Sequence, residues 1–232
     1  LTANLGNPLI PDYYNSYTHT GFMRNLIIRT ASTGETMIVV IFAKDDAERI
    51  NPLMEFIKNE FSQTTSLQYA VNTKQNDSIY DLDIICFSGR DYIFEKINGM
   101  IFKIGAKSFF QTNTAQAAQL YNYTLKYALK ENSGIAYDLY TGTGTIAIFI
   151  ASHFDKVIGI DSVLDSISDA KLNSELNSIT NTNFYAGDMK DILTNEFVQN
   201  NGKPDTIILD PPRAGVHQNV IEVIRQTAAK TI

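Results

Sequence analysis

The spacing of apolar residues changes near Gly105 and divides the chain into two regions of different character. Between Arg24 and Gly105, short apolar runs between turn residues predict strands, and Asp45–Phe61, with apolar residues every three or four positions, predicts a helix. The predicted strands are Asn25–Thr30, Thr36–Phe42, Ser66–Thr73, Leu82–Phe87, Asp91–Lys96 and Met100–Ile104. We therefore expect residues 21–105 to form a small α+β domain, preceded by a loop or linker at residues 1–20.

After Gly105, predicted strands and helices alternate along the chain. The strands are Ala136–Tyr140, Lys156–Asp161, Asn183–Ala186 and Asp205–Asp210, and the helices are Asn113–Lys130, a helix ending at Ser152, Val163–Asn177, Met189–Gln199 and Val216–Ala229. Such alternation is typical of right-handed βαβ units and an open parallel sheet, so residues 106–232 are predicted to be an α/β domain. Because Thr231 and Ile232 resemble the start of another strand, we expect this domain to be incomplete and the chain to be a fragment.

Composition narrows the classes of protein that fit this pattern. A net charge of −6 over 232 residues argues against a chain whose whole surface binds a phosphate backbone, although a local basic patch remains possible. The single cysteine, Cys86, excludes an internal disulfide and a multi-cysteine metal site. Apolar runs such as Met37–Ala43 are far shorter than the ~20 residues that span a bilayer. We expect a cytoplasmic monomer without a metal or a membrane segment.

A glycine turn, Asp138-Leu139-Tyr140-Thr141-Gly142-Thr143-Gly144-Thr145, joins a predicted strand to a helix. Glycines there let the backbone approach a ligand closely, and the helix N-terminus faces that ligand. Gly142, Gly144 and Ala147 also match the dinucleotide fingerprint G-x-G-x-x-A. The turn alone is therefore compatible with a nicotinamide site, an S-adenosylmethionine site or a turn without a ligand.

Carboxylates at three successive strand ends favour a nucleoside cofactor without phosphates. Asp138 would repel a pyrophosphate but suits a sulfonium cofactor with a cationic amino-acid end. Asp161 is placed to accept hydrogen bonds from ribose hydroxyls, and Asp188 to pair with an adenine amino group. Any one of these acids, taken alone, is more often a helix cap.

Two further motifs lie next to predicted elements of the α/β region. Asp210-Pro211-Pro212-Arg213 ends a buried strand, since two prolines cannot continue it, and fixes the carboxylate at the ligand-binding edge. The segment Lys107–Asn113 contains Phe109 and Gln111, which offer stacking and edge hydrogen bonds to a base. Burial of both phenylalanines, Phe109 and Phe110, is the competing interpretation of that segment.

In this order, the segments HTGFMRNLIIRTASTGE, SFFQTN, DLYTGTGT, GIDSV, FYAGD and ILDPPRAG resemble the RNA uracil-C5 methyltransferases, most closely the 23S rRNA (uracil-5-)-methyltransferase branch. The resemblance covers His19 to Ile232. It implies a Rossmann-like methyltransferase fold with S-adenosylmethionine as the cofactor and ribosomal RNA as the partner. The activity it implies is formation of 5-methyluridine in 23S ribosomal RNA.

The resemblance also implies roles for individual residues. The residues around the cofactor would be Gln111, Tyr140, Gly142, Gly144, Thr145, Asp161, Asp188 and Asp210. Phe109 and Gln111 would lie against the target base, and Asp210 and Arg213 near the reacting centre. The sequence departs from the family pattern at Thr141, where Cys is common, and at Asp161, where Glu is common.

The chemistry implied by the resemblance needs a cysteine thiolate that adds to C6 of uracil and a base that removes the C5 proton. We expect that cysteine, and then the general base, beyond Ile232, and interpret Cys86 as structural. The fragment alone is thus expected to be inactive. The alternatives are a transfer RNA methyltransferase, a non-catalytic RNA-binding protein with this fold, and an NAD-dependent oxidoreductase.

Overall fold

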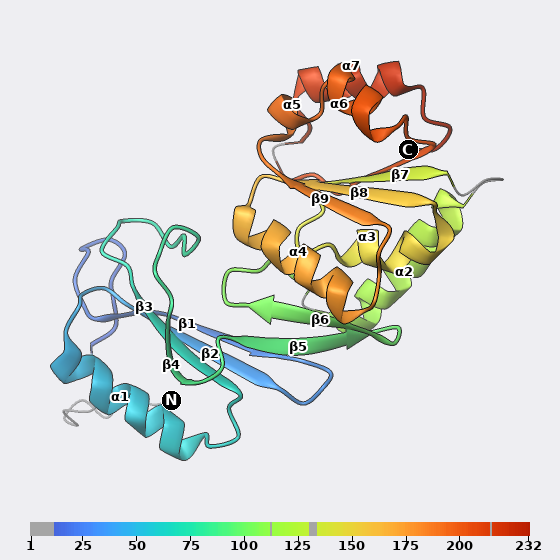
Figure 1. Ribbon diagram of the computed structural model, residues 1–232. Coiled ribbons are helices and arrows are strands. Elements are labelled where there is room, and N and C mark those ends of the chain that lie inside the picture. The colour runs from blue at the N-terminus through green and yellow to red at the C-terminus, as the bar shows by residue number, and fades with distance from the viewer. Residues whose placement is uncertain (1–11, 112, 130–133, 214) are drawn as a thin grey trace. The chain divides into compact units, whose positions relative to one another are not determined.

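The computed structural model describes residues 12–111, 113–129, 134–213 and 215–232, and the chain divides into two compact units (Figure 1). The first contains the chain up to Glu95 together with Gly105–Lys107, and the second contains Lys96–Ile104 and Ser108–Ile232. The sequence placed the boundary at residue 105. The division differs there because Ile97 and Phe102 pack in the core of the second unit. Of the predicted linker at residues 1–20, residues 1–11 lie outside the described part.

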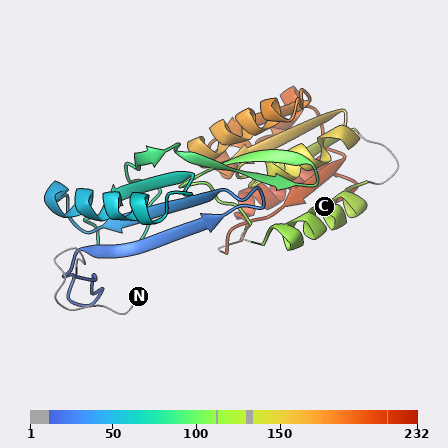
Figure 2. The same ribbon diagram turned by 90° about the horizontal axis from the view of Figure 1, so that it is seen from below.

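The first unit is built on a four-stranded sheet in the order β1-β2-β3-β4. The strands are β1 (Met23–Thr30), β2 (Thr36–Phe42), β3 (Ser66–Val71) and β4 (Ile85–Gly89), and helix α1 (Ala47–Glu60) connects β2 to β3. The β2–β3 pair is parallel and the outer pairs are antiparallel. Ile50 and Met54 of α1 pack on Ile38 and Val40 of the sheet, as the apolar spacing predicted; Figure 2 shows α1 along this sheet.

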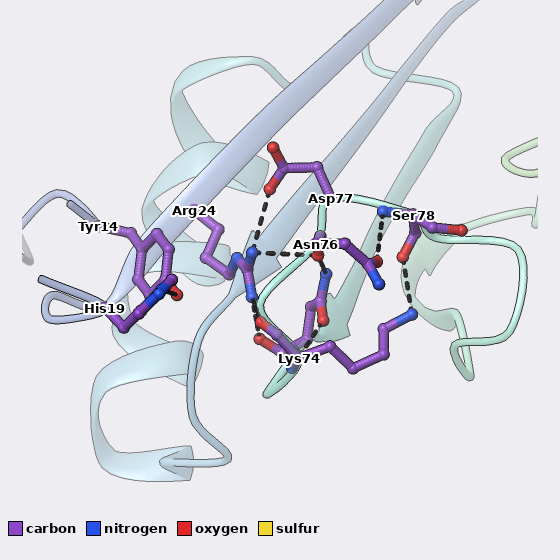
Figure 3. Close-up of polar contacts among 8 residues, drawn as sticks. Tyr14, His19, Arg24, Lys74, Asn76, Asp77 and Ser78 are labelled. Atoms are coloured by element: carbon purple, nitrogen blue, oxygen red, sulfur yellow. Dashed lines mark hydrogen bonds and ion pairs between the residues drawn. The ribbon is translucent and has the colours of Figure 1, made fainter. Parts of the chain in front are cut away.

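The buried guanidinium of Arg24 organises the connection between β3 and β4 (Figure 3). Its side chain is 2% exposed and lies 4.3 Å from the centroid of the Tyr14 ring. It donates hydrogen bonds to the Asn72 carbonyl (2.8 Å), the Asn76 carbonyl (3.1 Å), Asp77 Oδ1 (3.1 Å) and the Lys74 carbonyl. Four acceptors on one planar group fix the path of this loop.

Arg24→Lys is expected to reduce the free energy of unfolding of the first unit by about 3 kcal/mol, because a buried ammonium cannot reproduce the planar fork and leaves the partly buried carbonyls of Asn72 and Lys74 without their donor. Urea unfolding followed by circular dichroism measures the change. Arg49→Lys is the matched control, because Arg49 is 42% exposed where it pairs with Asp12. We expect the control to cost less than about 1 kcal/mol. Equal losses in the two variants would contradict the clamping role of Arg24.

The second unit contains a parallel sheet in the order β10-β7-β8-β9, with helices on both faces (Figure 1). The strands are β7 (Ile135–Leu139), β8 (Lys156–Asp161), β9 (Thr182–Ala186) and β10 (Thr206–Leu209). The helices α2 (Thr114–Ala128), α3 (Thr145–Ile150) and α4 (Leu164–Leu176) contribute to one core, and α5 (Met189–Ile192) and α7 (Gln218–Thr227) to another. The predicted open parallel α/β sheet is confirmed.

Three local features refine the prediction. A hairpin of β5 (Tyr92–Ile97) and β6 (Met100–Gly105) forms a separate two-stranded sheet, of which Lys96–Ile104 belong to the second unit. The single helix predicted at Met189–Gln199 is wrong, because Thr194 caps a new helix, α6 (Asn195–Asn201), by accepting from Phe197 N at 3.1 Å. Thr231 forms a parallel bridge with Thr206, beside β10, where the sequence predicted the start of a strand.

Candidate functional site

The carboxyl ends of the four parallel strands lie at one edge of the sheet, and most of the predicted site residues follow them. Leu139 pairs in register with Ile160 and Leu209, and Asp161 pairs with Ala186. The residues that follow these ends are Tyr140 after β7, Asp188 after β9 and Asp210 after β10, with Asp161 closing β8. Open α/β sheets bind ligands at this edge. The candidate site is therefore this edge.

The two glycines of the turn after β7 serve different purposes. Gly142 has φ +56°, and a Cβ built on it would meet no atom within 4 Å. Gly144 has φ +79°, and a Cβ there would lie 2.9 Å from Ala170 Cβ and 3.0 Å from the Phe184 ring. Gly144 is thus required for packing against α4 and β9. Gly142 leaves open space in which a ligand can approach the backbone.

Asp161 connects the glycine turn to the start of α4. Its Oδ2 accepts from Gly142 N at 2.9 Å, and its Oδ1 accepts from Val163 N at 2.9 Å. Each carboxylate oxygen has two acceptor sites, so both oxygens retain capacity for a further hydrogen bond. The predicted contact with ribose hydroxyls is compatible with this geometry.

Asp138 supports the turn from within the protein. It is 1% exposed, and its Oδ2 accepts from Thr141 Oγ1 at 2.6 Å and from Ala147 N, in the first turn of α3, at 3.0 Å. Burial raises the pKa of this carboxyl to about 7, and the nearby carboxylates of Asp210 and Asp161 add to the effect. From the sequence, the charge of Asp138 was expected to suit a cationic cofactor. In the structure the Asp138 side chain accepts hydrogen bonds from the turn and from α3, so it acts as an internal cap.

Tyr121, on α2, is a site residue that sequence reasoning missed. It is 2% exposed, and its hydroxyl donates to Thr145 Oγ1, a predicted cofactor residue, at 3.2 Å. Burial raises the pKa of Tyr121, as do the negative charges of Asp138 and Asp210, so the phenol stays protonated as a donor. No local pattern could have shown this contact, since the two residues come from different helices.

The segment that enters α2 presents one of its two phenylalanines to solvent. Phe109 is 62% exposed, whereas Phe110 packs against the core with its ring centroid 6.1 Å from that of Phe102. Gln111 is half-buried, and Ser108 donates to Asp169 Oδ2 at 2.8 Å. The competing interpretation, burial of both rings, is wrong for Phe109. Its exposed face is available for stacking on a base.

Two predicted residues and one unexpected pair complete the edge. Asp188 caps α5 by accepting from Lys190 N at 3.1 Å, and Arg213 is exposed after Asp210. Val163 and Leu164, which follow Asp161 after the single residue Ser162, are 37% and 67% exposed. Sequence reasoning missed this apolar pair, although apolar residues at the start of a helix were the available signal. Such side chains can cover the flat face of a nucleoside base.

Cys86 lies on β4, in the first unit, and is exposed rather than enclosed in an apolar strand. Partial burial and the charge of Asp91 raise the pKa of its thiol, which disfavours the nucleophilic thiolate. Among the described residues, no group of histidine, cysteine and acidic side chains could hold a metal ion. No helix within those same ranges is long and apolar enough to cross a membrane.

A parallel sheet with a glycine turn after its first strand and acids at successive strand ends has the Rossmann-like fold of S-adenosylmethionine-dependent methyltransferases. The model of the tRNA (uracil-5-)-methyltransferase family matches residues 33–230. The chain belongs to this family. That membership agrees with the resemblance found in the sequence and leaves the oxidoreductase alternative without support.

Individual relatives agree with the family assignment. The chain is 50% identical over 220 residues to an uncharacterized RNA methyltransferase of Porphyromonas gingivalis, covering 95% of this chain and 47% of that protein. A Bacteroides thetaiotaomicron protein of the same description is 50% identical over 223 residues, with coverage of 95% and 49%. The crystal structure of Pyrococcus abyssi tRNA (uracil-54, C5)-methyltransferase in complex with S-adenosyl-L-homocysteine superimposes with a TM-score of 0.73 at 25% identity, covering 94% of this chain and 50% of that one. The chain spans about half the length of these relatives.

Proposed function

We propose that this chain is the cofactor-binding and base-binding part of an enzyme that transfers a methyl group from S-adenosylmethionine to C5 of a uridine in 23S ribosomal RNA. The observation that carries the proposal is the glycine turn, whose open face at Gly142 is fixed by Asp161 at the same sheet edge as Asp210. The family match and the similarity to a C5-methyltransferase solved with S-adenosyl-L-homocysteine support it.

The residues at the edge fit this cofactor. The open space at Gly142 admits its amino-acid end, and both oxygens of Asp161 can still accept from ribose hydroxyls. Asp188 is exposed and can accept from an adenine amino group. When bound, the cofactor supplies an electrophilic methyl group on a sulfonium. Gln111, Tyr140, Gly144, Thr145 and Asp210 complete the proposed set.

The target base requires activation because uracil C5 is a poor nucleophile, and a thiolate added to C6 provides it. Cys86 is unsuited to this role because partial burial and the charge of Asp91 raise the pKa of its thiol. We propose that the nucleophile and the general base are residues of the parent protein that this chain, about half the length of its relatives, does not contain. The residues in this chain bind and orient the base: Phe109 stacks on it, and Asp210 and Arg213 line the reacting centre.

Cys86→Ser in the full-length parent protein is expected to leave kcat and KM for methyl transfer within about twofold of the wild type, because a thiol held protonated contributes nothing to the reaction. Steady-state transfer from tritiated S-adenosylmethionine measures both constants. A loss of activity by more than about 100-fold would make Cys86 the nucleophile and overturn the assignment of that role to the missing part.

The RNA is tested by offering the full-length protein undermethylated 23S ribosomal RNA and transfer RNA in parallel and mapping the product base. Methylation of one uridine in the ribosomal RNA is the expected result. Transfer RNA is the second candidate, favoured by the description of the family and by the Pyrococcus enzyme. Methylation of transfer RNA alone would show that transfer RNA, and not ribosomal RNA, is the substrate. Retention of RNA without methyl transfer would leave a binding protein and contradict the proposed reaction.

A further inference from the structure

Helix α4 carries a polar stripe formed by Asp169, Asn173 and Asn177. The C-cap residue, Asn177, continues the spacing of four residues that places all three on one side of the helix. Asn173 is completely buried, and all its partners lie within the second unit. A stripe of this kind on a helix that borders the candidate site needs a physical explanation.

The two asparagines pair with the backbone of β6 as a neighbouring strand would. Asn177 Oδ1 accepts from Ile101 N at 2.9 Å, and its Nδ2 donates to the Ile101 carbonyl at 2.7 Å. Asn173 Oδ1 accepts from Lys103 N at 2.7 Å, and its Nδ2 lies 3.5 Å from the Lys103 carbonyl. Because Ile101 and Lys103 are alternate residues of one strand, the side-chain amides satisfy the edge of the β5–β6 hairpin.

Asn173 makes one contact that Asn177 lacks. Its Nδ2 also donates to the carbonyl of Thr143, between the two glycines of the cofactor turn, at 3.1 Å. Asn173 therefore bonds both to the strand β6 and to the glycine turn.

Asp169 extends the same connection toward the base-binding segment. It pairs with Lys103 Nζ at 3.3 Å and accepts from Ser108 Oγ at 2.8 Å. Ser108 directly precedes Phe109, whose ring is exposed to solvent. Gln111 follows two residues after Phe109. One face of α4 thus contacts the turn that approaches the cofactor and the segment that approaches the base.

We propose that Asn173 is a positioning residue for methyl transfer, which fixes the glycine turn relative to the segment carrying Phe109 and Gln111. The inference rests on the proposed function, since it assigns the cofactor to the turn and the base to that segment. The distance between the methyl group and C5 depends on both elements. Displacement of about 1 Å at a reacting centre lowers rates by about 100-fold.

The test compares Asn173→Asp with Asn177→Asp in the full-length protein. Each substitution keeps the shape of the side chain and replaces the donating amide, but only Asn173 touches the turn. For Asn173→Asp we expect kcat to fall by at least about tenfold and the Kd of S-adenosyl-L-homocysteine, measured by calorimetry, to rise by about tenfold, each a change of roughly 1.4 kcal/mol. The KM for RNA is expected to stay within threefold, and Asn177→Asp to leave all three constants within threefold.

Stability needs its own control because Asn173 is buried. Ser174→Ala removes a buried hydroxyl of the same helix, which lies 2.6 Å from Thr182 Oγ1 and does not contact the turn. Asn173→Ser replaces the aspartate variant if the buried charge prevents folding.

Three results would overturn the inference. Equal effects of Asn173→Asp and Asn177→Asp would show that Asn173 is a structural residue only. A loss of kcat in Ser174→Ala equal to that in Asn173→Asp would show the same. In both cases the proposed function stands as long as the wild-type protein methylates RNA. A wild type that neither binds S-adenosyl-L-homocysteine nor methylates RNA would overturn the proposed function and this inference together.

Discussion

Gly142→Ala is expected to weaken binding of S-adenosyl-L-homocysteine by at least about 100-fold, or roughly 2.7 kcal/mol. The reason is geometric: a Cβ at this position would meet no protein atom within 4 Å and would occupy the open space in which we propose that the ligand approaches the turn. The same substitution is expected to reduce the free energy of unfolding by only about 1–2 kcal/mol, the cost of a left-handed backbone with a side chain. Calorimetric titration and urea unfolding of the same preparation measure the two quantities.

Gly34→Ala is the matched control for this experiment. Gly34 lies in the turn between β1 and β2, has φ +84° and likewise has no atom within 4 Å of a built Cβ. Gly34→Ala therefore places a side chain on a left-handed backbone in the first unit, as Gly142→Ala does in the second. The affinity for S-adenosyl-L-homocysteine is expected to stay unchanged in Gly34→Ala. Unchanged affinity in Gly142→Ala as well would show that the ligand does not approach the open side of the turn.

Asp138→Asn is expected to abolish a pH dependence of stability that the wild-type chain shows between about pH 4 and pH 7. The unfolded carboxyl titrates near 4, whereas burial holds the folded pKa at about 7. Within this window the unfolded state has lost a proton that the folded state keeps. Stability therefore falls as the pH rises, by roughly 1.4 kcal/mol per unit, and levels off above about pH 7. An amide carries no such charge, and its oxygen can still accept from Ala147 N.

Urea unfolding at pH 5, 6, 7 and 8 gives the slope for each variant. Thr141→Val is the comparison, because it keeps the carboxylate and removes a hydroxyl whose hydrogen bond lowers the pKa of Asp138. The slope is expected to persist in Thr141→Val and to extend to higher pH. If Asp138→Asn retained the wild-type slope, the titrating group would lie elsewhere.

The sequence predicts well those features that depend on neighbouring residues. The strand Lys156–Asp161 is observed with the predicted bounds, and the helix predicted to begin at Asn113 does begin there, because Asn113 caps α2 by accepting from Gln116 N at 3.0 Å. Both follow from local rules, apolar content in a buried strand and a side chain that satisfies the first turn of a helix. The parallel sheet then fixes which strand ends share an edge, so Asp161 at the end of β8 could be assigned together with Asp188 after β9 and Asp210 after β10.

Features that depend on distant partners were beyond those rules. Asn173 bonds to Lys103, 70 positions earlier, and Tyr121 bonds to Thr145 on another helix. Cys86 is exposed on β4, which is an edge strand of its sheet. The apolar pattern of a strand does not reveal whether the strand lies at an edge. In each case the sequence gives the type of residue, and the fold decides what it contacts.

Nuclear magnetic resonance of this chain during titration with S-adenosyl-L-homocysteine, which detects even weak binding, shows whether the carboxyl edge of the parallel sheet binds S-adenosylmethionine. We expect saturable shifts of the Gly142, Val163 and Asp188 amide signals and no shift of the Gly34 amide signal in the first unit. Two results would contradict binding of S-adenosylmethionine at this edge. One is a shift of the same amide signals with NAD⁺ but not with S-adenosyl-L-homocysteine. The other is the absence of shifts at this edge with S-adenosyl-L-homocysteine at millimolar concentration.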